Sequence, residues 1–518
     1  MKATRREWIG LAVLALPCVL YSMDLSVLNL AVPHLTKDLQ PSASELLWIM
    51  DVYGFLLAGF LITMGTLGDR IGRRRLLLIG AGAFGAMSVF AAFANSAEML
   101  IVARAVLGIA AATLAPSTLS LIRNMFLDDK ERTLAIGIWV GSFSAGGAIG
   151  PLVGGVLLEY FWWGSVFLIA VPVMALLLVL GPLLLPEFKD PKAGRLDLAS
   201  AALATTSVLA VIYGMKHTAE HGFSSRALIV VTIGAALGFI FVRRQKSLAD
   251  PMIDISLFRS RVISAALSIN IIALFIAFAA FLFIAQYFQL VLGMGPLEAG
   301  LWTAPSGVIF VIGSALAPML LHRFGPANVM SGGLVLTALG FMFLSQIGMR
   351  EDLWIVMTGF LLMCLGLAPV GTASTDLMMS AVPPERAGAA SGVSETSFEF
   401  GGALGIAVLG SIMAASYRSI MEHAPLELSR ETLDQARHTL GGALAVAEHL
   451  TAEQGERLLV VAREAFVRSL RMVCAPGAVL SLLAAAIAFK MLKHKSAGST
   501  EQTTEAGALE PSARSVSE

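Results

Sequence analysis

Residues 139–155 read WVGSFSAGGAIGPLVGG, an apolar stretch in which glycine recurs every few positions. Part of this stretch returns in the second half of the chain, because SFSAGGAIG at 142–150 is echoed by SFEFGGALG at 397–405. The copies differ in charge, since the second carries Glu399 where the first carries Ser144. The echo indicates a duplicated chain in which one copy has gained a carboxylate.

The composition is that of an integral membrane protein. Of the 518 residues, 57% are hydrophobic and only 14% are charged, whereas soluble domains are about half apolar and about a quarter charged. The formal net charge is zero, which leaves no basic surplus for nucleic acid. Cys18, Cys364 and Cys474 fall in apolar runs without metal-binding or redox spacing, so we read them as buried hydrophobic residues.

Apolar runs of about 20 residues, the length that crosses a bilayer, recur along the chain. We expect fourteen spanning helices and an all-α integral membrane fold. The first run, from Ile9 to about Val32, is too long for a signal peptide and contains Asp24, so we expect it to be retained as the first spanning helix. No ten-residue alternation of the kind found in membrane β-barrels occurs.

Lysine and arginine are distributed unequally between the two sets of loops, and this sets the orientation. Basic residues gather in one set, exemplified by Arg70, Arg123, Arg195, Arg243 and Arg386. The short loops of the other set hold only Lys37, Lys216, Arg226 and Arg350. The sequence therefore predicts that both termini are cytoplasmic.

Further echoes extend the duplication. DRIG at 69–72 resembles HRFG at 322–325, and Glu-Arg at 131–132 recurs at 385–386. The predicted order is six, two and six helices, and parallel halves of this kind are a transporter architecture. The predicted domains are a first half (1–188), two inserted helices (189–260), a second half (261–495) with an external helical hairpin (419–470), and a disordered cytoplasmic tail (496–518).

A basic turn between the second and third predicted helices carries the most specific motif. It reads GTLGDRIGRRR from Gly65, and its pattern G-x-x-G-D-R-x-G-R-R resembles the signature loop of the major facilitator superfamily. By this resemblance the gating residues are Gly65, Gly68, Asp69, Arg70, Gly72 and Arg73. Asp69 is expected to cap the next helix or to pair with a basic residue across the bundle, as a latch that breaks when the halves move. A loop that only sets topology is the alternative.

Other segments narrow the resemblance to the fourteen-helix drug:proton antiporters, which include quaternary-ammonium efflux pumps of the QacA and SmvA type. The similar segments, spread over roughly residues 8–420, are 23–33, 104–108, 146–155, 162–172 and 385–410. The resemblance implies a proton-driven exporter of lipophilic cations, such as biocides and dyes, in a bacterial cytoplasmic membrane.

Carboxylates at membrane depth are costly and therefore indicate function. Asp24 lies about 22 Å from Ile9 along a helix, near mid-membrane. Glu395 and Glu399 are four residues apart and share one helix face. Two neighbouring carboxylates repel each other, so we expect one of the pair to bind a proton and a cation alternately and not both at once. Structural hydrogen bonding is the alternative role for all three.

The other candidates are assigned by position or by resemblance. Arg104 is implied in proton coupling, with a counter-ion role as the alternative, and Asp51 and Asp376 lie near helix ends. The residues of the helix-five signature are further gating candidates: their bend is expected to control closure between helices and to limit proton leak, with close helix packing alone as the alternative. They are Gly146, Gly150, Pro151, Gly154 and Gly155.

Aromatic residues and methionine along the helices suit a cavity for flat cations; the candidates are Tyr53, Phe143, Trp302, Phe398 and Met378. No phosphate-binding loop and no metal-binding motif occur, so the sequence predicts no ATP, metal, other cofactor or enzymatic activity. We expect a monomer whose partners are protons, small lipophilic cations and the bilayer. Two alternatives stay open: an exporter of an endogenous metabolite or antibiotic, and a non-transporting sensor or scaffold.

Overall fold

The computed structural model describes residues 2–191, 196–221, 224–248, 250–348, 353–424 and 428–493. Within these ranges every regular element is a helix. Thirteen helices are long and apolar enough to cross a membrane. The predicted tail at 496–518 lies outside the described residues.

The first half and the insert follow each other in chain order. The first half comprises α1 (Arg5–Leu39), α2 (Ala43–Ile71), α3 (Arg73–Ala92), α4 (Ala97–Met125), α5 (Asp129–Tyr160), α6 (Ser165–Leu168) and α7 (Ala170–Leu184). The insert comprises α8 (Leu198–His221) and α9 (Ser225–Gln245), followed by the short 3₁₀ helix η1 (Ile255–Arg259). Side chains with oxygen acceptors begin several of these helices: Thr4, Ser42 and Asp128 each accept backbone N–H groups of the first turn.

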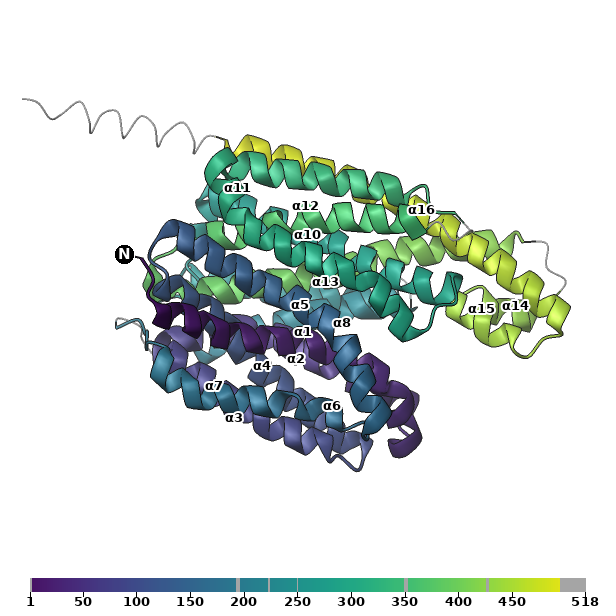
Figure 1. The fold of residues 1–518 in the computed structure, drawn as a ribbon, viewed down its shortest axis with the longest axis horizontal. Helices are drawn as coiled ribbons and strands as arrows, with labels where there is room; N and C mark the ends of the chain where they lie inside the picture. The colour runs from purple at the N-terminus through teal and green to yellow at the C-terminus, as the bar shows by residue number, and fades with distance from the viewer. Residues whose placement is uncertain are drawn as a thin grey trace, which may run out of the picture.

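The second half lies beside the first, as Figure 1 shows. It comprises α10 (Arg261–Gln286), the π-helical turn η2 (Tyr287–Val291), α11 (Pro296–Leu344), α12 (Leu353–Ser380), η3 (Pro384–Arg386), α13 (Ala387–Glu422), α14 (Arg430–Ala436), α15 (Leu440–Ala447) and α16 (Ala452–Leu492). Extensive contacts of α5 with α11 and of α2 with α13 join the halves.

The repeated basic turn has the same backbone feature in both halves. Gly72 joins α2 to α3 with φ 110°, and Gly325 interrupts α11 with φ 74° and ψ 160°. Side chains with a Cβ rarely adopt such positive φ values, so glycine is required at both turns. α11 is therefore the counterpart of α2 and α3 combined, and the sequence echo at 69–72 and 322–325 has a structural cause.

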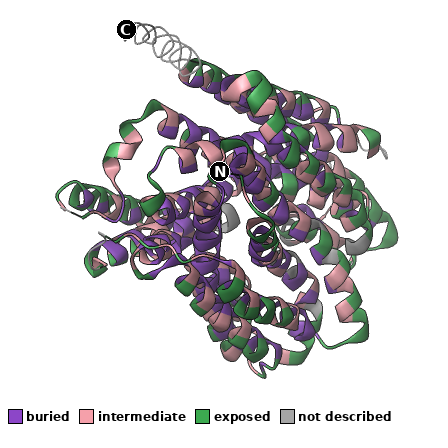
Figure 2. Ribbon diagram, turned by 60° about the vertical axis from the view of Figure 1, so that its left-hand side comes forward, coloured by how far each residue is buried: buried purple, intermediate pink, exposed green. Residues whose placement is uncertain are grey.

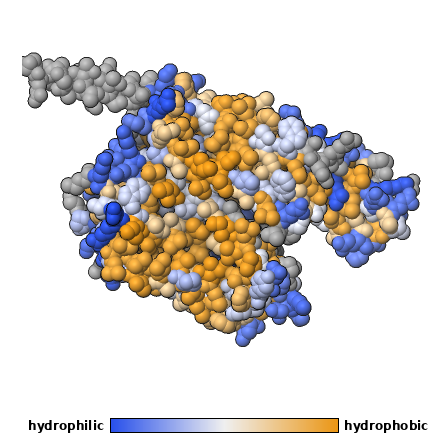
Figure 3. Space-filling view, viewed as in Figure 1, coloured by the Kyte–Doolittle hydropathy of each residue, from blue (hydrophilic) through white to orange (hydrophobic). Residues whose placement is uncertain are grey.

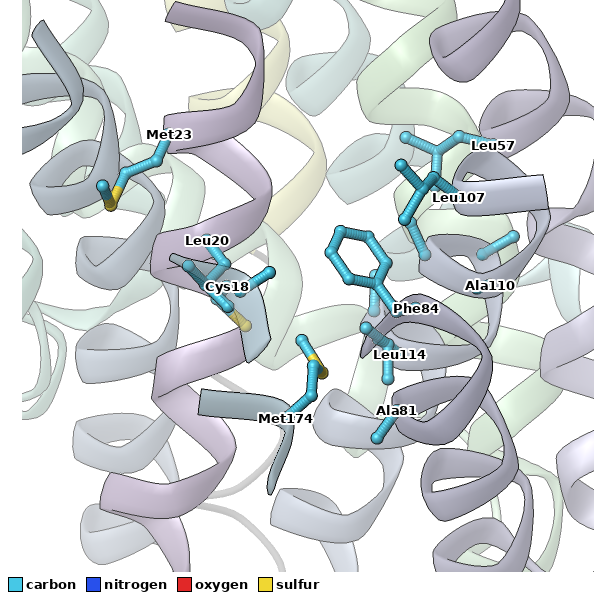
Figure 4. Close-up of a cluster of buried hydrophobic side chains, with 14 of the residues drawn as sticks. Cys18, Leu20, Met23, Leu57, Ala81, Phe84, Leu107, Ala110, Leu114 and Met174 are labelled. Carbon is cyan, nitrogen blue, oxygen red and sulfur yellow. The ribbon is translucent and has the colours of Figure 1, made fainter. Parts of the chain in front are cut away.

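Each half is held together by its own large cluster of buried apolar residues. One is built almost entirely by α1–α7 and the other by α10–α16. Figure 4 shows part of the first cluster, in which Cys18, Phe84, Leu107 and Met174 project from four helices toward one another. All three cysteines are buried and free.

The surface around the bundle is apolar, and its two ends are polar. Figure 3 shows hydrophobic residues over the middle of the molecule, and Figure 2 shows exposed residues along the outward faces of the helices. Val179, Leu228 and Phe239 are each more than three-fifths exposed, as expected of side chains that face lipid. We call the end of the bundle at which the N-terminus lies the basic end, because α2 and α4 finish there with Arg70 and Arg123 in their last turns. The opposite end, where α14 and α15 project, is the hairpin end (Figure 1).

Residues 419–470, predicted as a separate helical hairpin, are shared between the ends of two long helices and two short helices. The first of these residues continue α13 to Glu422, and the last part continues without interruption into the spanning helix α16. Between these two helices the described residues form two separate short helices, α14 and α15. Thr451 accepts the N–H of Gln454 and caps α16.

Candidate functional site

A cavity of about 250 Å³ lies between the halves. Its walls come from α5 of the first half and from α10, α11, α12 and α13 of the second. Most of the lining is aromatic or aliphatic, and Ser144, Asn270, Thr375 and Ser394 add polar groups. The duplicated stretch thus contributes to the cavity from both copies.

Aromatic rings from four helices, α5, α10, α11 and α13, surround this cavity. Phe398 packs edge-on against Phe278, with ring centroids 5.3 Å apart, and lies 6.4 Å from Phe143. Phe143 in turn meets Trp139 at 4.9 Å. Ring faces and edges at these distances form a concave aromatic surface, which is suited to flat apolar molecules and to cations.

Glu395 is the only carboxylate that lines the cavity within the described chain. The residue is 8% exposed. Within the described chain its carboxylate makes no hydrogen bond and no ion pair, and it faces the cavity. A charge buried without a partner is strongly unfavourable, so this carboxylate needs either a proton or a cation from the cavity.

Glu399 lies one turn further along α13 and bonds across the halves. The hydroxyl of Tyr21, on α1, donates to its carboxylate. Tyr21 also packs edge-on against Phe143, with centroids 5.4 Å apart. Tyr21 therefore connects an acid of the second half to the aromatic wall of the first. Sequence reasoning missed this residue, although a tyrosine in the middle of an apolar span is a usable signal because its hydroxyl needs a partner.

Asp24 lies apart from the cavity, in a pair with Arg104. The guanidinium of Arg104 is fully buried; its Nε donates to the carbonyl of Ile49 at 3.2 Å, and its Cζ lies 4.6 Å from the Tyr53 ring centroid. One terminal nitrogen of Arg104 is buried without a hydrogen bond. The pair ties α1, α2 and α4 of the first half together, so Asp24 and Glu395 do not share one cavity.

The signature turn closes the basic end. Asp69 accepts hydrogen bonds from Arg73 at 2.7 and 2.9 Å and from the backbone N–H groups of Gly388 and Ala389 at 2.9 and 2.8 Å. An acid is well placed there because the N-terminus of α13 presents free N–H groups and a positive dipole end. Asp69 thus caps α13 of the opposite half and not the next helix α3, and its basic partner Arg73 lies in its own half and not across the bundle.

Arg73 completes this closure by donating to the carbonyls of Pro384 and Glu385 at 2.7 and 2.9 Å. Arg70 instead pairs with Asp250, which follows α9 within the insert, at 2.9 Å. Gly68 packs against Leu76 within the turn. The gating residues taken from the motif therefore meet both the second half and the insert.

Glycines allow the halves to meet closely at two related crossings. A Cβ on Gly392 of α13 would lie 2.8 Å from the carbonyl of Leu61 on α2, and one on Gly137 of α5 would lie 2.4 Å from the carbonyl of Ser314 on α11. Gly65 makes a closer contact still, because its Cβ would lie 2.3 Å from the carbonyl of Gly388. Sequence reasoning did not select Gly137 or Gly392.

We expect Gly65→Leu to open the basic end. The added side chain overlaps the backbone of α13 only when the halves are closed, and overpacking of this kind costs about 1–3 kcal/mol. Ser394→Cys, at the cavity wall, reports opening by its reaction with a thiol reagent, since the native cysteines are buried. Gly54→Leu on the same helix is the control, because no atom lies within 4 Å of its Cβ position. Equal labelling in both backgrounds would contradict the closure role.

The glycines of the helix-five signature pack α5 against α1 within the first half. A Cβ on Gly146 would lie 2.2 Å from the carbonyl of Val19, and one on Gly154 would lie 2.8 Å from the side chain of Val27. Gly150 is buried, while the Cβ position of Gly155 is open. α5 runs without interruption through Pro151. The structure thus gives Gly146 and Gly154 a packing role.

Asp376 and Asp51 lie at opposite ends of the bundle. Asp376 accepts from Thr133 at 2.9 Å and lies 3.5 Å from Arg132, where α12 meets the start of α5 at the basic end. Asp51 pairs with Lys216 of α8 near the hairpin end. Neither acid lines the cavity.

The chain matches known transporters over most of its length. The model of the Major Facilitator Superfamily matches residues 14–406. The chain is 44% identical to the multidrug efflux pump LfrA of Mycolicibacterium smegmatis over 482 residues, which cover 93% of this chain and 95% of that protein. It is 36% identical to the methyl viologen resistance protein SmvA of Salmonella typhimurium over 491 residues, which cover 94% and 99% of the two chains.

The solved structure of the human organic anion transporter MFSD10 (TETRAN) is similar in fold. The match has a TM-score of 0.57 at 14% sequence identity, and it covers 92% of this chain and all of that one. These matches confirm the resemblance carried by the signature turn. The chain belongs to the major facilitator superfamily and is a multi-pass bacterial membrane transporter, not an enzyme.

Proposed function

We propose that this protein is a drug-efflux antiporter that exports lipophilic cations in exchange for protons. The observation that carries the proposal is Glu395, a buried carboxylate without a protein partner in an aromatic cavity between the two halves. The relatives of this chain include a multidrug efflux pump and a methyl viologen resistance protein, and both support efflux as the direction of transport.

Exchange follows from the chemistry of this carboxylate. When the cavity is empty, a proton neutralises Glu395; when a lipophilic cation enters, the cation provides the neutralising charge and the proton leaves. The aromatic rings of Phe143, Phe278 and Phe398 hold the apolar body of the cargo and add cation–π attraction. Proton and cargo therefore exclude each other from one site, as antiport requires.

Alternating access would arise from movement of the two halves about this cavity. In the present structure Asp69 and Arg73 hold the basic end closed against Gly388 and Pro384. We propose that the basic end is cytoplasmic, because lysine and arginine are retained on that side of the membrane. This arrangement corresponds to a state from which cargo is released outward, and the latch must break before new cargo can enter.

We propose fourteen spans by counting α11 as two. Its 49 residues include the break at Gly325, and a helix of that length would extend about 74 Å, more than twice the roughly 30 Å of a bilayer core. The order is then six, two and six spans over residues 1–188, 189–260 and 261–495. Both termini lie in the cytoplasm, and the proton gradient drives a monomer without ATP or cofactor.

Export of an antibiotic is the second candidate. The chain is 30% identical to the tetracenomycin C resistance and export protein of Streptomyces glaucescens over 491 residues. The cavity favours cations instead, since no lysine or arginine is among its lining residues in the described chain. A non-transporting scaffold would have no need of a partnerless acid in such a cavity.

Reconstitution tests the proposal directly. In proteoliposomes that carry a pH gradient, we expect ethidium to move against the direction of proton flow, and added ethidium to release protons. Collapse of the gradient with an ionophore should stop ethidium movement. Absence of proton movement with ethidium and with every quaternary ammonium compound tried would refute the proton-coupled function.

A further inference from the structure

Helix α8 of the insert covers the seam between the two halves. It packs against both α2 and α13. Near the basic end the hydroxyls of Thr63 and Thr205 lie 3.3 Å apart, and further along Gly59 leaves room for Leu209. A buried cluster then joins Ile212 and Met215 of α8 to one alanine of each half, Ala58 and Ala407. The insert is thus part of the transport bundle.

The last turns of α8 bring a cation to this seam. The ammonium group of Lys216 pairs with the carboxylate of Asp51 on α2 and lies 4.6 Å from the ring centroid of Phe55, over its face. Trp48 and Tyr213 lie 6.5 and 6.2 Å from the Phe55 ring. A carboxylate with an aromatic face is a site that binds an ammonium group, and here the protein fills it with its own side chain.

This arrangement has the same chemistry as the central cavity. Both places combine one carboxylate with aromatic rings. The side chains of Lys216 and Asp51 are 35% and 24% exposed, so the pair is open to exchange with a cation from outside. In contrast, Arg104 of the Asp24 pair is fully buried.

We propose that Asp51 and Phe55 form a second cation subsite toward the hairpin end, in which Lys216 of the insert competes with the exported cation. The inference rests on the proposed efflux of lipophilic cations. It gives the insert a function: after cargo leaves the central cavity, Lys216 displaces it from Asp51 and prevents it from lingering at the exit.

Removal of the Lys216 ammonium group should make Asp51 and Phe55 retain the exported cation for longer. For ethidium, a singly charged cation, we expect both KM and kcat to fall. We expect each of the two constants to fall by about two- to five-fold, the range that corresponds to the loss of a partly exposed ion pair. A purely structural role of Lys216 would lower kcat or protein yield without lowering KM.

A cysteine at this position allows the charge to be restored chemically. The three native cysteines are buried, so Lys216→Cys provides the accessible thiol of the described chain. In proteoliposomes, aminoethyl methanethiosulfonate adds a primary ammonium to the introduced thiol, and methyl methanethiosulfonate adds only a neutral methylthio group. We expect the ammonium adduct to restore the KM and kcat of the unmodified wild type for ethidium, and the neutral adduct not to do so.

Arg226→Cys is the matched control, since Arg226 is an exposed cation at the start of α9 in the same insert. Neither reagent should change its transport kinetics. If wild type transports ethidium but Lys216→Cys has the same KM, or if both adducts behave alike, the competition is refuted while the proposed function stands. If wild type moves no cation at all, the proposed function fails and this inference fails with it.

Discussion

Replacing Glu395 with glutamine is expected to lower proton-coupled export of ethidium by roughly 10- to 100-fold. Loss of a hydrogen bond or contact to a charged group costs about 1.5–3 kcal/mol, and glutamine can neither carry the proton nor neutralise the cation. The aromatic walls would remain, so weak binding of ethidium should persist. Initial rates of efflux from proteoliposomes at a fixed pH gradient measure the effect.

Glu399→Gln provides the matched comparison on the same helix. The amide oxygen of glutamine can still accept the hydroxyl of Tyr21, so the link between the halves is kept. We therefore expect a smaller loss of transport than for Glu395→Gln. Equal and complete loss in both variants would show that the acids act as one unit, and wild-type rates in Glu395→Gln would contradict its role.

Replacing Asp24 with asparagine is expected to destabilise the protein more than any other single change considered. Arg104 is fully buried and already has one terminal nitrogen without a hydrogen bond. Removal of one partner of a buried ion pair leaves an uncompensated charge and costs about 3–5 kcal/mol. Thermal unfolding of the purified protein in detergent should show a lower Tm, and transport should fall with it.

The double variant Asp24→Asn with Arg104→Gln separates structure from coupling. The double variant no longer has a buried guanidinium without a carboxylate partner, so we expect most of the stability lost in Asp24→Asn to return. If transport then stays low while the Tm recovers, the pair contributes to proton movement as well as to packing. A single Asp24→Asn variant with the Tm of wild type would contradict the structural role.

The sequence predicts features that repeat or that lie on one helix. The turns at Gly72 and Gly325 are visible as an echo because both require glycine with positive φ. The shared face of Glu395 and Glu399 follows from their spacing of one helical turn. The family follows from the signature turn, and its latch role agrees with the bonds of Asp69 to α13.

Pairings between distant helices could not be predicted in this way. Nothing in one sequence says that Tyr21 meets Glu399, that Arg104 meets Asp24, or that Lys216 meets Asp51. These contacts depend on how helices rotate and pack, and side-chain spacing along one helix does not record that. For the same reason the depth of Asp24 in its helix could not show that it lies in a pair with Arg104, apart from the cavity of Glu395.

The aromatic candidates illustrate the same limit. Of the aromatic residues named from the sequence, Phe143 and Phe398 line the cavity. Tyr53 instead packs under Arg104, and Trp302 is partly exposed on the outside of α11. Composition indicated an aromatic cavity, but it could not say which face of each helix turns toward it.

The central claim is that one carboxylate, Glu395, holds either a proton or the exported cation. It is tested most directly by adding ethidium to the purified protein in weakly buffered detergent solution and recording the released protons. We predict proton release for wild type, saturating together with ethidium binding, and none for Glu395→Gln, although that variant still binds ethidium weakly. Proton release from Glu395→Gln equal to that of wild type would contradict the claim.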